Sequence, residues 1–343
     1  MPDLKNSITL TLLAILALLL SGCEDKPSER TTLPYAEFKI ALSAMSFLAY
    51  NQGYTSENGI DLQPISLEAG PDVVASLSSA SERSGVAGNI AIEPVAAMIA
   101  AQRDPVVIAT VLTSDRHVQL VTFAESGITD DPATLRGKRI GFVANTIGET
   151  YLLGLLERAG LSRDDLETLN ARPTDLRSAL VRGDLDAAIL WDPFIQQARR
   201  IYNQGIKAGT AEDRGELLAL VDPTIFTLRM NVVTTREKLE GSREQLVGLL
   251  NALIETEGYI EENRAEAQAS VETWLGLEAG DLGDFFSTTS FRVELQETEL
   301  RDQLQVTVNR LRAANPTSFA PNDYSPFVDS TLLVEIAPDR VSN

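Results

Sequence analysis

The sequence predicts a two-lobed α/β protein, and three observations support this prediction. Short apolar runs alternate with helical patterns along most of the chain, as expected where helices join parallel strands. Two extended segments, near Val106–Phe123 and Ile225–Thr235, enclose a block of the same pattern. The hydrophobic content of 44% is typical of a globular chain with a sizeable core. We therefore expect the chain to leave a first lobe, build a second lobe and return.

The expected first lobe begins with three pairs of strand and helix. The pairs are 37–44 with 45–59, 61–70 with 71–81, and 84–89 with 93–102. Pro71 stands in the first turn of its helix, where its fixed backbone angle is favoured. A long extended segment over 106–124 then leads away from this lobe.

The expected second lobe repeats the alternation, and the chain then returns. Its elements are a strand over 138–144, helices over 148–160 and 173–183, and a strand, turn and helix over 185–201. A second extended segment over 224–235 leads back, and the remaining pattern is mostly helical. The predicted division is a signal peptide over 1–22, a tether over 23–34, lobe one over 35–115 with 230–343, and lobe two over 116–229.

The first residues are typical of an export signal. The apolar run Ile8–Leu20 is too short to favour a membrane-spanning helix. It is followed by Leu20-Ser21-Gly22-Cys23, which resembles a bacterial lipobox and contains the only cysteine. We expect cleavage before Cys23 and a lipid on its thiol, which would anchor the exported chain to the cell membrane. The alternative is an ordinary signal peptide or anchor helix with a chance cysteine.

The charge of the chain excludes one class of partner. The formal net charge is −20 at pH 7, and nucleic-acid binding requires Lys and Arg to neutralise phosphates. The same acidity argues against broad contact with anionic lipid.

Turns between strands and helices provide the candidate ligand residues. Strand ends meet at the crevice of a two-lobed α/β protein, so these turns should face one cleft. Nucleotide fingerprints are absent, because the chain has neither G-x-G-x-x-G nor G-x-x-x-x-G-K-[ST]. The candidates for ligand binding are Ser43, Met45, Gly70, Asn89, Glu93, Asn145, Thr146, Gly148, Glu149, Trp191 and Asp192.

An ordered set of short motifs lies within residues 130–200. It comprises Leu135-Arg136-Gly137-Lys138, Asp175, Ala179-Leu180, Gly183, Asp186-Ala187 and Trp191-Asp192-Pro193. In order and spacing the set resembles the sulfonate/nitrate/taurine and thiamine-pyrimidine-precursor binding proteins, the substrate-binding components of ABC importers. The usual glycine-threonine or glycine-serine turn of that family is replaced here by Asn145-Thr146-Ile147-Gly148.

The resemblance implies a fold, a function and partners. The fold is the type II periplasmic-binding-protein-like fold, with a cleft between the lobes and two hinge segments. The function is capture of a small solute by a monomeric receptor without a cofactor. The partners are a membrane permease and its ATPase.

Two turns carry the expected binding chemistry. Trp191 is placed to stack on a flat ligand or to cover an alkyl chain, and otherwise fills the lobe interior. Thr146 and the N–H groups of Gly148 and Glu149 can hold an anion at a helix start, or Thr146 serves only as an N-cap. Asp192 either binds a ligand N–H or caps the next helix.

The charge of the expected pocket favours one ligand class over another. If Glu93, Glu149, Asp192 and Glu68 face the cleft, a ligand with N–H donors, such as a pyrimidine or an amine, is preferred over a bare anion. Arg116 and His117 are the counterweight, since they can pair with an anion.

Catalytic and metal patterns are absent from the sequence. His117 is the only histidine, and there is no G-x-S-x-G and no set of residues with zinc-ligand spacing. We therefore expect no enzyme activity and no metal. The alternatives are a pyrimidine-synthesis-like enzyme of the same fold and a ligand-sensing subunit for a membrane kinase.

Overall fold

The computed structural model describes residues 30–68, 70–79, 81, 84–314 and 316–343. The predicted signal peptide and Cys23 lie outside these residues. None of the helices within this part of the chain combines the length and apolar character needed to cross a membrane.

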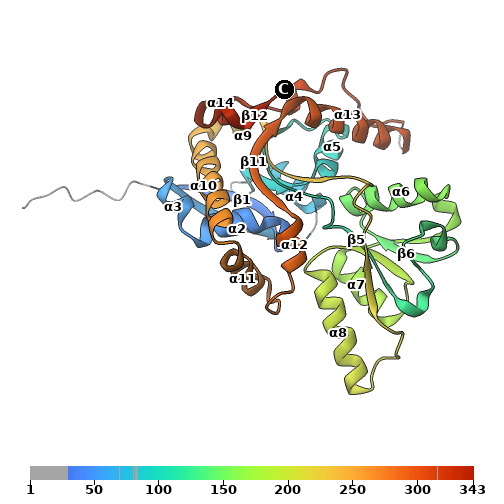
Figure 1. Ribbon diagram of the computed structural model, residues 1–343. Helices are drawn as coiled ribbons and strands as arrows, with labels where there is room; N and C mark the ends of the chain where they lie inside the picture. The colour runs from blue at the N-terminus through green and yellow to red at the C-terminus, as the bar shows by residue number, and fades with distance from the viewer. Residues whose placement is uncertain (1–29, 69, 80, 82–83, 315) are drawn as a thin grey trace, which may run out of the picture.

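The first lobe is built on a sheet of seven strands, in the order β12-β11-β4-β10-β3-β1-β2 (Figure 1). β1 pairs in parallel with β2 and β3, whereas β10 runs antiparallel to both β3 and β4. The strands are β1 (Thr31–Phe38), β2 (Ile60–Leu67), β3 (Ala87–Ile90), β4 (Pro105–Ser114), β10 (Leu228–Thr235), β11 (Ser290–Gln296) and β12 (Val341–Ser342).

Helices of two chain regions cover this sheet. The first group follows β1, β2 and β3, and the second group belongs to the returning chain. The helices are α2 (Ala44–Asn51), α3 (Tyr54–Glu57), α4 (Gly70–Leu77), α5 (Ile92–Ala100), α9 (Arg236–Gly241), α10 (Arg243–Glu262), α11 (Arg264–Leu275), α12 (Gly283–Thr288), α13 (Glu297–Ala314) and α14 (Thr331–Ile336).

The second lobe has a sheet of five strands, in the order β7-β6-β8-β5-β9. β6 runs parallel to β7 and β8, while β5 runs antiparallel to β8 and β9. The elements are β5 (Gln119–Phe123), β6 (Arg139–Phe142), α6 (Ile147–Ala159), β7 (Glu167–Asn170), α7 (Pro173–Arg182), β8 (Ala187–Leu190), α8 (Phe194–Ala208) and β9 (Leu217–Leu220).

Short 3-10 helices complete the two lobes. They are η1 (Ala41–Ser43), η2 (Ala124–Ser126), η3 (Pro132–Leu135), η4 (Arg163–Asp165), η5 (Ser325–Phe327) and η6 (Pro338–Arg340).

The chain passes between the sheets twice, from β4 to β5 and from β9 to β10. The predicted lobe boundary at residues 115–116 lies in the first crossing, whereas the one at 229–230 lies inside β10, just after the second crossing. The buried apolar side chains of the two lobes form one continuous cluster, which includes Phe38 of the first lobe and Trp191 of the second. The lobes are therefore packed against each other in this conformation.

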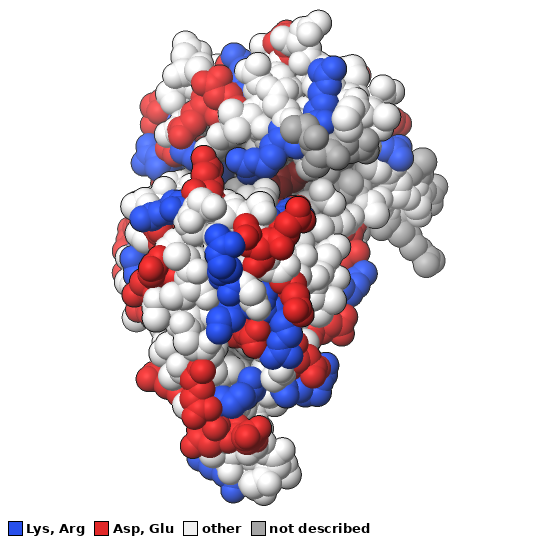
Figure 2. Space-filling model, turned by 90° about the vertical axis from the view of Figure 1, so that its right-hand side faces the viewer, with Lys and Arg blue, Asp and Glu red and all other residues white. Residues whose placement is uncertain are grey.

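The charged surface does not separate into blocks of one sign on the face shown in Figure 2. Acidic and basic side chains are interspersed there over both lobes. This face offers no continuous basic surface, in keeping with the net charge of −20.

Candidate functional site

A cavity lies where the two lobes meet, at the ends of β1, β3 and β8. Its free volume is about 380 Å³, but the centre of a water molecule can occupy only about 30 Å³ of it. At roughly 10–15 Å³ per enclosed water, this is room for two or three waters. We call this cavity the interlobe pocket. Its lining residues are Phe38, Ile40, Leu42, Glu68, Gly70, Ala91, Pro94, Thr146, Ile147, Trp191 and Met230.

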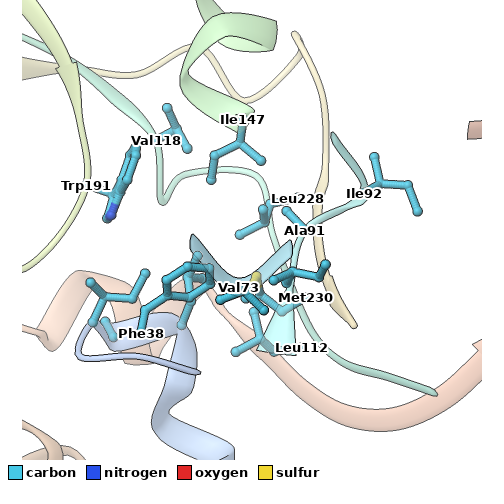
Figure 3. Close-up of a cluster of buried hydrophobic side chains, with 14 of the residues drawn as sticks. Phe38, Val73, Ala91, Ile92, Leu112, Val118, Ile147, Trp191, Leu228 and Met230 are labelled. Atoms are coloured by element: carbon cyan, nitrogen blue, oxygen red, sulfur yellow. The ribbon is translucent and has the colours of Figure 1, made fainter. Parts of the chain in front are cut away.

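The walls of the interlobe pocket are apolar. Figure 3 shows Trp191 and Ile147 of the second lobe facing Phe38 and Met230 of the first lobe. Trp191 is only 4% exposed, and its ring packs edge-on against Phe194 at a centroid distance of 6.2 Å. A pocket of this kind favours a ligand with an apolar body.

Three polar features belong to residues that line the pocket. The indole Nε1–H of Trp191 is a buried donor with no hydrogen-bond partner among the described residues. The helices α6 and α4 begin at the pocket, because Thr146, Ile147 and Gly70 line it. Helix starts and an unpartnered N–H favour a hydrogen-bond acceptor or an anion.

Two glycines lie close to neighbouring side chains around this pocket, and one of them allows close packing. A Cβ on Gly70 would lie 2.4 Å from Cγ of Pro94, so the start of α4 can approach α5 only without a side chain. A Cβ on Gly148 would lie 3.4 Å from Cζ3 of Trp191, in ordinary contact. Gly148 therefore lies next to the Trp191 indole and does not line the pocket.

Thr146 has the capping role that was weighed against ligand binding. Its Oγ1 accepts a hydrogen bond from the Gly148 N–H at 3.1 Å and donates to the Val143 carbonyl at 2.7 Å. The side chain is therefore engaged in the first turn of α6, although the residue also lines the pocket.

Only three of the eleven predicted ligand residues, Gly70, Thr146 and Trp191, line the interlobe pocket. Met45 is fully buried in the first lobe, and Ser43 is buried at the end of η1. Asn89 is buried and donates from Nδ2 to the Leu42 carbonyl at 3.0 Å. Asn145 is exposed, with a φ of 57° in the left-handed region that Asn tolerates.

The carboxylates expected to face one cleft are dispersed. Glu149 forms an ion pair with Arg163 and accepts the Asn145 N–H at 2.6 Å, which is a structural role at the start of α6. Glu93 lines a neighbouring groove between α5, α6 and α13, and Asp192 lines a third cavity. Only Glu68 remains at the interlobe pocket.

Glu68 itself forms an ion pair in a bridge between the lobes. Arg172 lies 2.9 Å from Glu68 and 3.2 Å from Asp72, and Thr174 donates to Glu68 at 2.5 Å. Burial raises the pKa of Glu68, but the hydrogen bonds from Thr174 and Arg172 and the charge of Arg172 together outweigh it, so that the pKa is lowered. A ligand rich in N–H donors was expected because four carboxylates were expected to face one cleft, and they do not do so. Arg116 and His117 do not line this pocket either.

Sequence reasoning missed most of the apolar lining. Phe38, Ile40 and Leu42 were placed within a strand over 37–44, but β1 ends at Phe38 and the next residues turn along the pocket. Ile147 was treated as part of a polar turn, and Met230 as part of a plain extended segment. The apolar character of these residues was visible, but it indicated core and not pocket.

Buried titratable groups elsewhere have altered pKa values. Burial raises the pKa of Glu93, with partial relief from hydrogen bonds and from Arg310. Burial also raises the pKa of Glu37 to about 7, although Ser46 donates a hydrogen bond to it. Within the part of the chain that the structure describes, no three or more His, Cys, Asp and Glu side chains group to hold a metal ion.

The comparisons with known proteins place the chain in a family. The family model described as NMT1/THI5 like matches residues 42–267, well over half of the sequence. The chain belongs to this family. Its two-lobed architecture is that of the periplasmic binding proteins: the nitrate-binding protein NrtA from Synechocystis PCC 6803 superposes with a TM-score of 0.70 at 13% identity. That superposition covers 91% of this chain and 89% of NrtA.

Curated relatives differ in what their names describe. A protein of Escherichia coli (strain K12) named for binding aliphatic sulfonates is 29% identical over 134 residues, which are 39% of this chain and 41% of that protein. A 4-amino-5-hydroxymethyl-2-methylpyrimidine phosphate synthase of Aspergillus parasiticus is 29% identical over 143 residues, 42% of this chain and 40% of the enzyme. The matched part of the chain spans less than half the length of these curated relatives.

Proposed function

We propose that the protein is the substrate-binding component of an ABC importer and captures a small organic solute in the interlobe pocket. The observation that carries the proposal is the lining of this pocket, which joins apolar walls from both lobes to one unpartnered indole N–H and two helix starts. The partners would be a membrane permease and its ATPase.

The chemistry of the lining favours a solute with an apolar body and an acceptor head. A bare inorganic anion such as nitrate would leave the walls of Phe38, Ile147 and Trp191 without a ligand surface to cover. An alkyl or aryl sulfonate presents both parts, and it agrees with the naming of the Escherichia coli relative. We therefore place organic sulfonates ahead of nitrate and of amines.

Loading requires the lobes to move apart. The pocket as it stands admits only a few waters, so an alkanesulfonate cannot enter without separation of the lobes at the two crossings. We propose that these crossings are the hinges and that the solute binds during closure. Small-angle scattering should then give a smaller radius of gyration with solute than without it, and an equal radius at saturation would oppose this step.

The solute class is tested by calorimetry against a matched panel. The panel contains alkanesulfonates of increasing chain length, nitrate, and 4-amino-5-hydroxymethyl-2-methylpyrimidine. Affinity should rise by roughly 0.8 kcal/mol for each CH₂ that enters the pocket, until the pocket is filled. Nitrate binding as tight as that of the best sulfonate would overturn the proposed class, and mass spectrometry of solute released from unfolded protein would then identify another.

An enzyme of the same fold is the second candidate, and one observation favours it, the similarity to the synthase. The position of His117 opposes it. The only histidine of the sequence does not line the interlobe pocket, and burial lowers its pKa to about 3. Formation of 4-amino-5-hydroxymethyl-2-methylpyrimidine phosphate, the compound for which the synthase is named, on incubation of the purified protein with a small-molecule cell extract would decide for the enzyme.

Membrane attachment through Cys23 belongs to the same proposal. The motif Leu20-Ser21-Gly22-Cys23 motivates it, with export to the outer face of the cell membrane. In detergent phase separation the wild-type protein should enter the detergent phase and Cys23→Ser should not. Equal partitioning of the two would remove the lipid from the proposal.

A further inference from the structure

The cavity that Asp192 lines is at the first crossing between the lobes. Its free volume is about 900 Å³, of which about 260 Å³ is open to the centre of a water molecule. It is walled by the crossing from β4 to β5, by the start of α8, by β9 and by α12. We call it the hinge cavity. Its polar lining residues are Ser114, Arg116, His117, Gln119, Asp192, Gln196, Arg199, Glu216, Asp281, Asp284 and Thr288.

Two deeply buried side chains in this cavity have polar atoms without a partner. Asp192 is 7% exposed and His117 is 5% exposed. Neither Oδ1 of Asp192 nor Nε2 of His117 has a hydrogen-bond partner among the described residues. A buried polar atom without a partner costs roughly 1–3 kcal/mol, so a ligand that satisfies both atoms gains from each.

The charges around the cavity favour a cation. Its lining contains the four carboxylates of Asp192, Glu216, Asp281 and Asp284 and the two guanidinium groups of Arg116 and Arg199, a formal charge of −2. The lining also includes apolar surface from Phe285 and Ile195. The ring of Phe285 packs edge-on against His117 at a centroid distance of 5.2 Å.

We infer that the hinge cavity binds a small organic ammonium ion. The ammonium group would donate one hydrogen bond to Oδ1 of Asp192 and another to Nε2 of His117, and its alkyl part would contact Phe285. The nitrogen must carry at least two N–H groups, because each of the two acceptors receives its own hydrogen bond. This site is separate from the interlobe pocket and takes a ligand of opposite charge.

The protonation states of the two acceptors agree with this assignment. Burial lowers the pKa of His117 to about 3, so the ring is neutral and one of its nitrogens is an acceptor. Burial raises the pKa of Asp192 to about 7, with opposing contributions from Gln196 and Arg199 and a further increase from Asp281. Arg116 from the crossing, Glu216 near β9 and Asp284 on α12 complete the charged groups around the cavity. Binding of an ammonium ion should therefore strengthen as the pH rises through about 7, where Asp192 becomes a carboxylate.

The position of the cavity couples it to the movement of the lobes. Asp192 and Arg199 belong to the second lobe, Asp284 and Phe285 to the first lobe, and His117 to the connection between them. A ligand held by all three parts binds one arrangement of the lobes more tightly than another. By linkage it would then change the affinity of the interlobe pocket for its solute.

The histidine provides a direct test, since His117 alone contributes imidazole signals. Methylammonium chloride is titrated at pH 8 into the full-length protein while the His117 ring resonances are followed by NMR. Tetramethylammonium, which has no N–H donor, and potassium chloride at equal ionic strength are the control salts. The variants are Asp192→Asn and, as a matched control with the same change of charge, the exposed Asp130→Asn.

Methylammonium should shift the ring resonances of the wild type and of Asp130→Asn in a saturable way, and Asp192→Asn should weaken this binding about tenfold or more. Asp192→Asn is expected to fold, because an amide is close in shape to the protonated carboxyl that burial already favours. Should it not fold, the wild type at pH 6 replaces it, where binding should be weaker than at pH 8. No saturable shift, an equal shift with tetramethylammonium, or binding that is unaffected by both the variant and the pH would overturn the inference. Sulfonate calorimetry is independent of this result, so failure here leaves the proposed function standing.

Discussion

Two consecutive residues, Trp191 and Asp192, lie in two different cavities between the same two lobes. Trp191 lines the interlobe pocket among apolar side chains, and Asp192 lines the hinge cavity among charged ones. They directly follow β8: Trp191 comes at the end of the strand and Asp192 lies in the turn that leads into α8. The Trp-Asp-Pro motif therefore serves two chemical environments, and the acidity of one does not describe the other.

The largest expected effect is a dependence of the protein's free energy of unfolding on pH, caused by Asp192 in the hinge cavity. The pKa of Asp192 is raised from 3.8 to about 7 in the folded protein, so the folded state holds a proton that the unfolded state releases. Stability from this proton is fully present below pH 4 and is lost as the pH rises to about 7. Between pH 5 and pH 8 the loss should be about 2–3 kcal/mol.

Asp192→Asn isolates this effect, because the amide does not titrate. Urea unfolding of wild type and variant at pH 5 and pH 8 should show the variant gaining relative stability at the higher pH. A difference that is the same at both pH values would mean that Asp192 is ionised in the folded protein throughout. Glu37, whose pKa is also raised to about 7, lowers the stability of both proteins with pH and cancels in the comparison.

The second effect concerns the interlobe pocket. Trp191→Ala removes a buried aromatic wall and an unpartnered N–H donor, and should weaken alkanesulfonate binding by about 1–3 kcal/mol. Asp192→Asn should leave that affinity within about 0.5 kcal/mol, since its side chain lies in the other cavity. Calorimetry on both folded variants makes the comparison. Equal losses of sulfonate affinity in the two variants would show that both residues act on one site. The two cavities would then not be separate binding sites.

The smallest effect concerns the bridge at the rim of the interlobe pocket. Arg172 connects the lobes through Glu68 and Asp72, and its side chain is 55% exposed, so salt screens the pairs. Arg172→Gln should speed solute release at low salt and have no effect at 1 M salt.

The control for this bridge is Arg136→Gln, which removes an exposed pair with Asp165 within the second lobe. Stopped-flow release should be unchanged in this control at either salt concentration. A salt-independent difference between Arg172→Gln and wild type would mean that the bridge does not act as an ion pair between the lobes.

The sequence predicted the fold because the alternating pattern extends over most of the chain. The predicted elements 138–144 and 148–160 correspond to β6 and α6, and the extended segment 106–124 corresponds to β4 and β5 with a short connection. The family resemblance rested on the same region and is confirmed by the family match.

The site was predicted less completely, for two physical reasons. Apolar residues such as Phe38 and Met230 have the same pattern whether they face a core or a pocket between lobes. Side-chain direction at the end of a strand depends on one residue of register, which sequence patterns do not fix. Trp191 and Asp192 were therefore assigned to one cleft, and Glu93 was assigned to the interlobe pocket although it lines the neighbouring groove.

The most direct test of the account measures whether Trp191 senses the solute. Trp274, the other tryptophan, is stacked on Phe47 at 4.4 Å in the first lobe, so Trp274→Phe leaves Trp191 as the single indole and keeps an aromatic partner for Phe47. The emission of this variant is recorded during titration with hexanesulfonate, in parallel with calorimetry. The account predicts a saturable change in Trp191 emission with the same dissociation constant as the calorimetric one. Calorimetric binding without any change in emission would contradict it, because the solute would then bind away from the interlobe pocket.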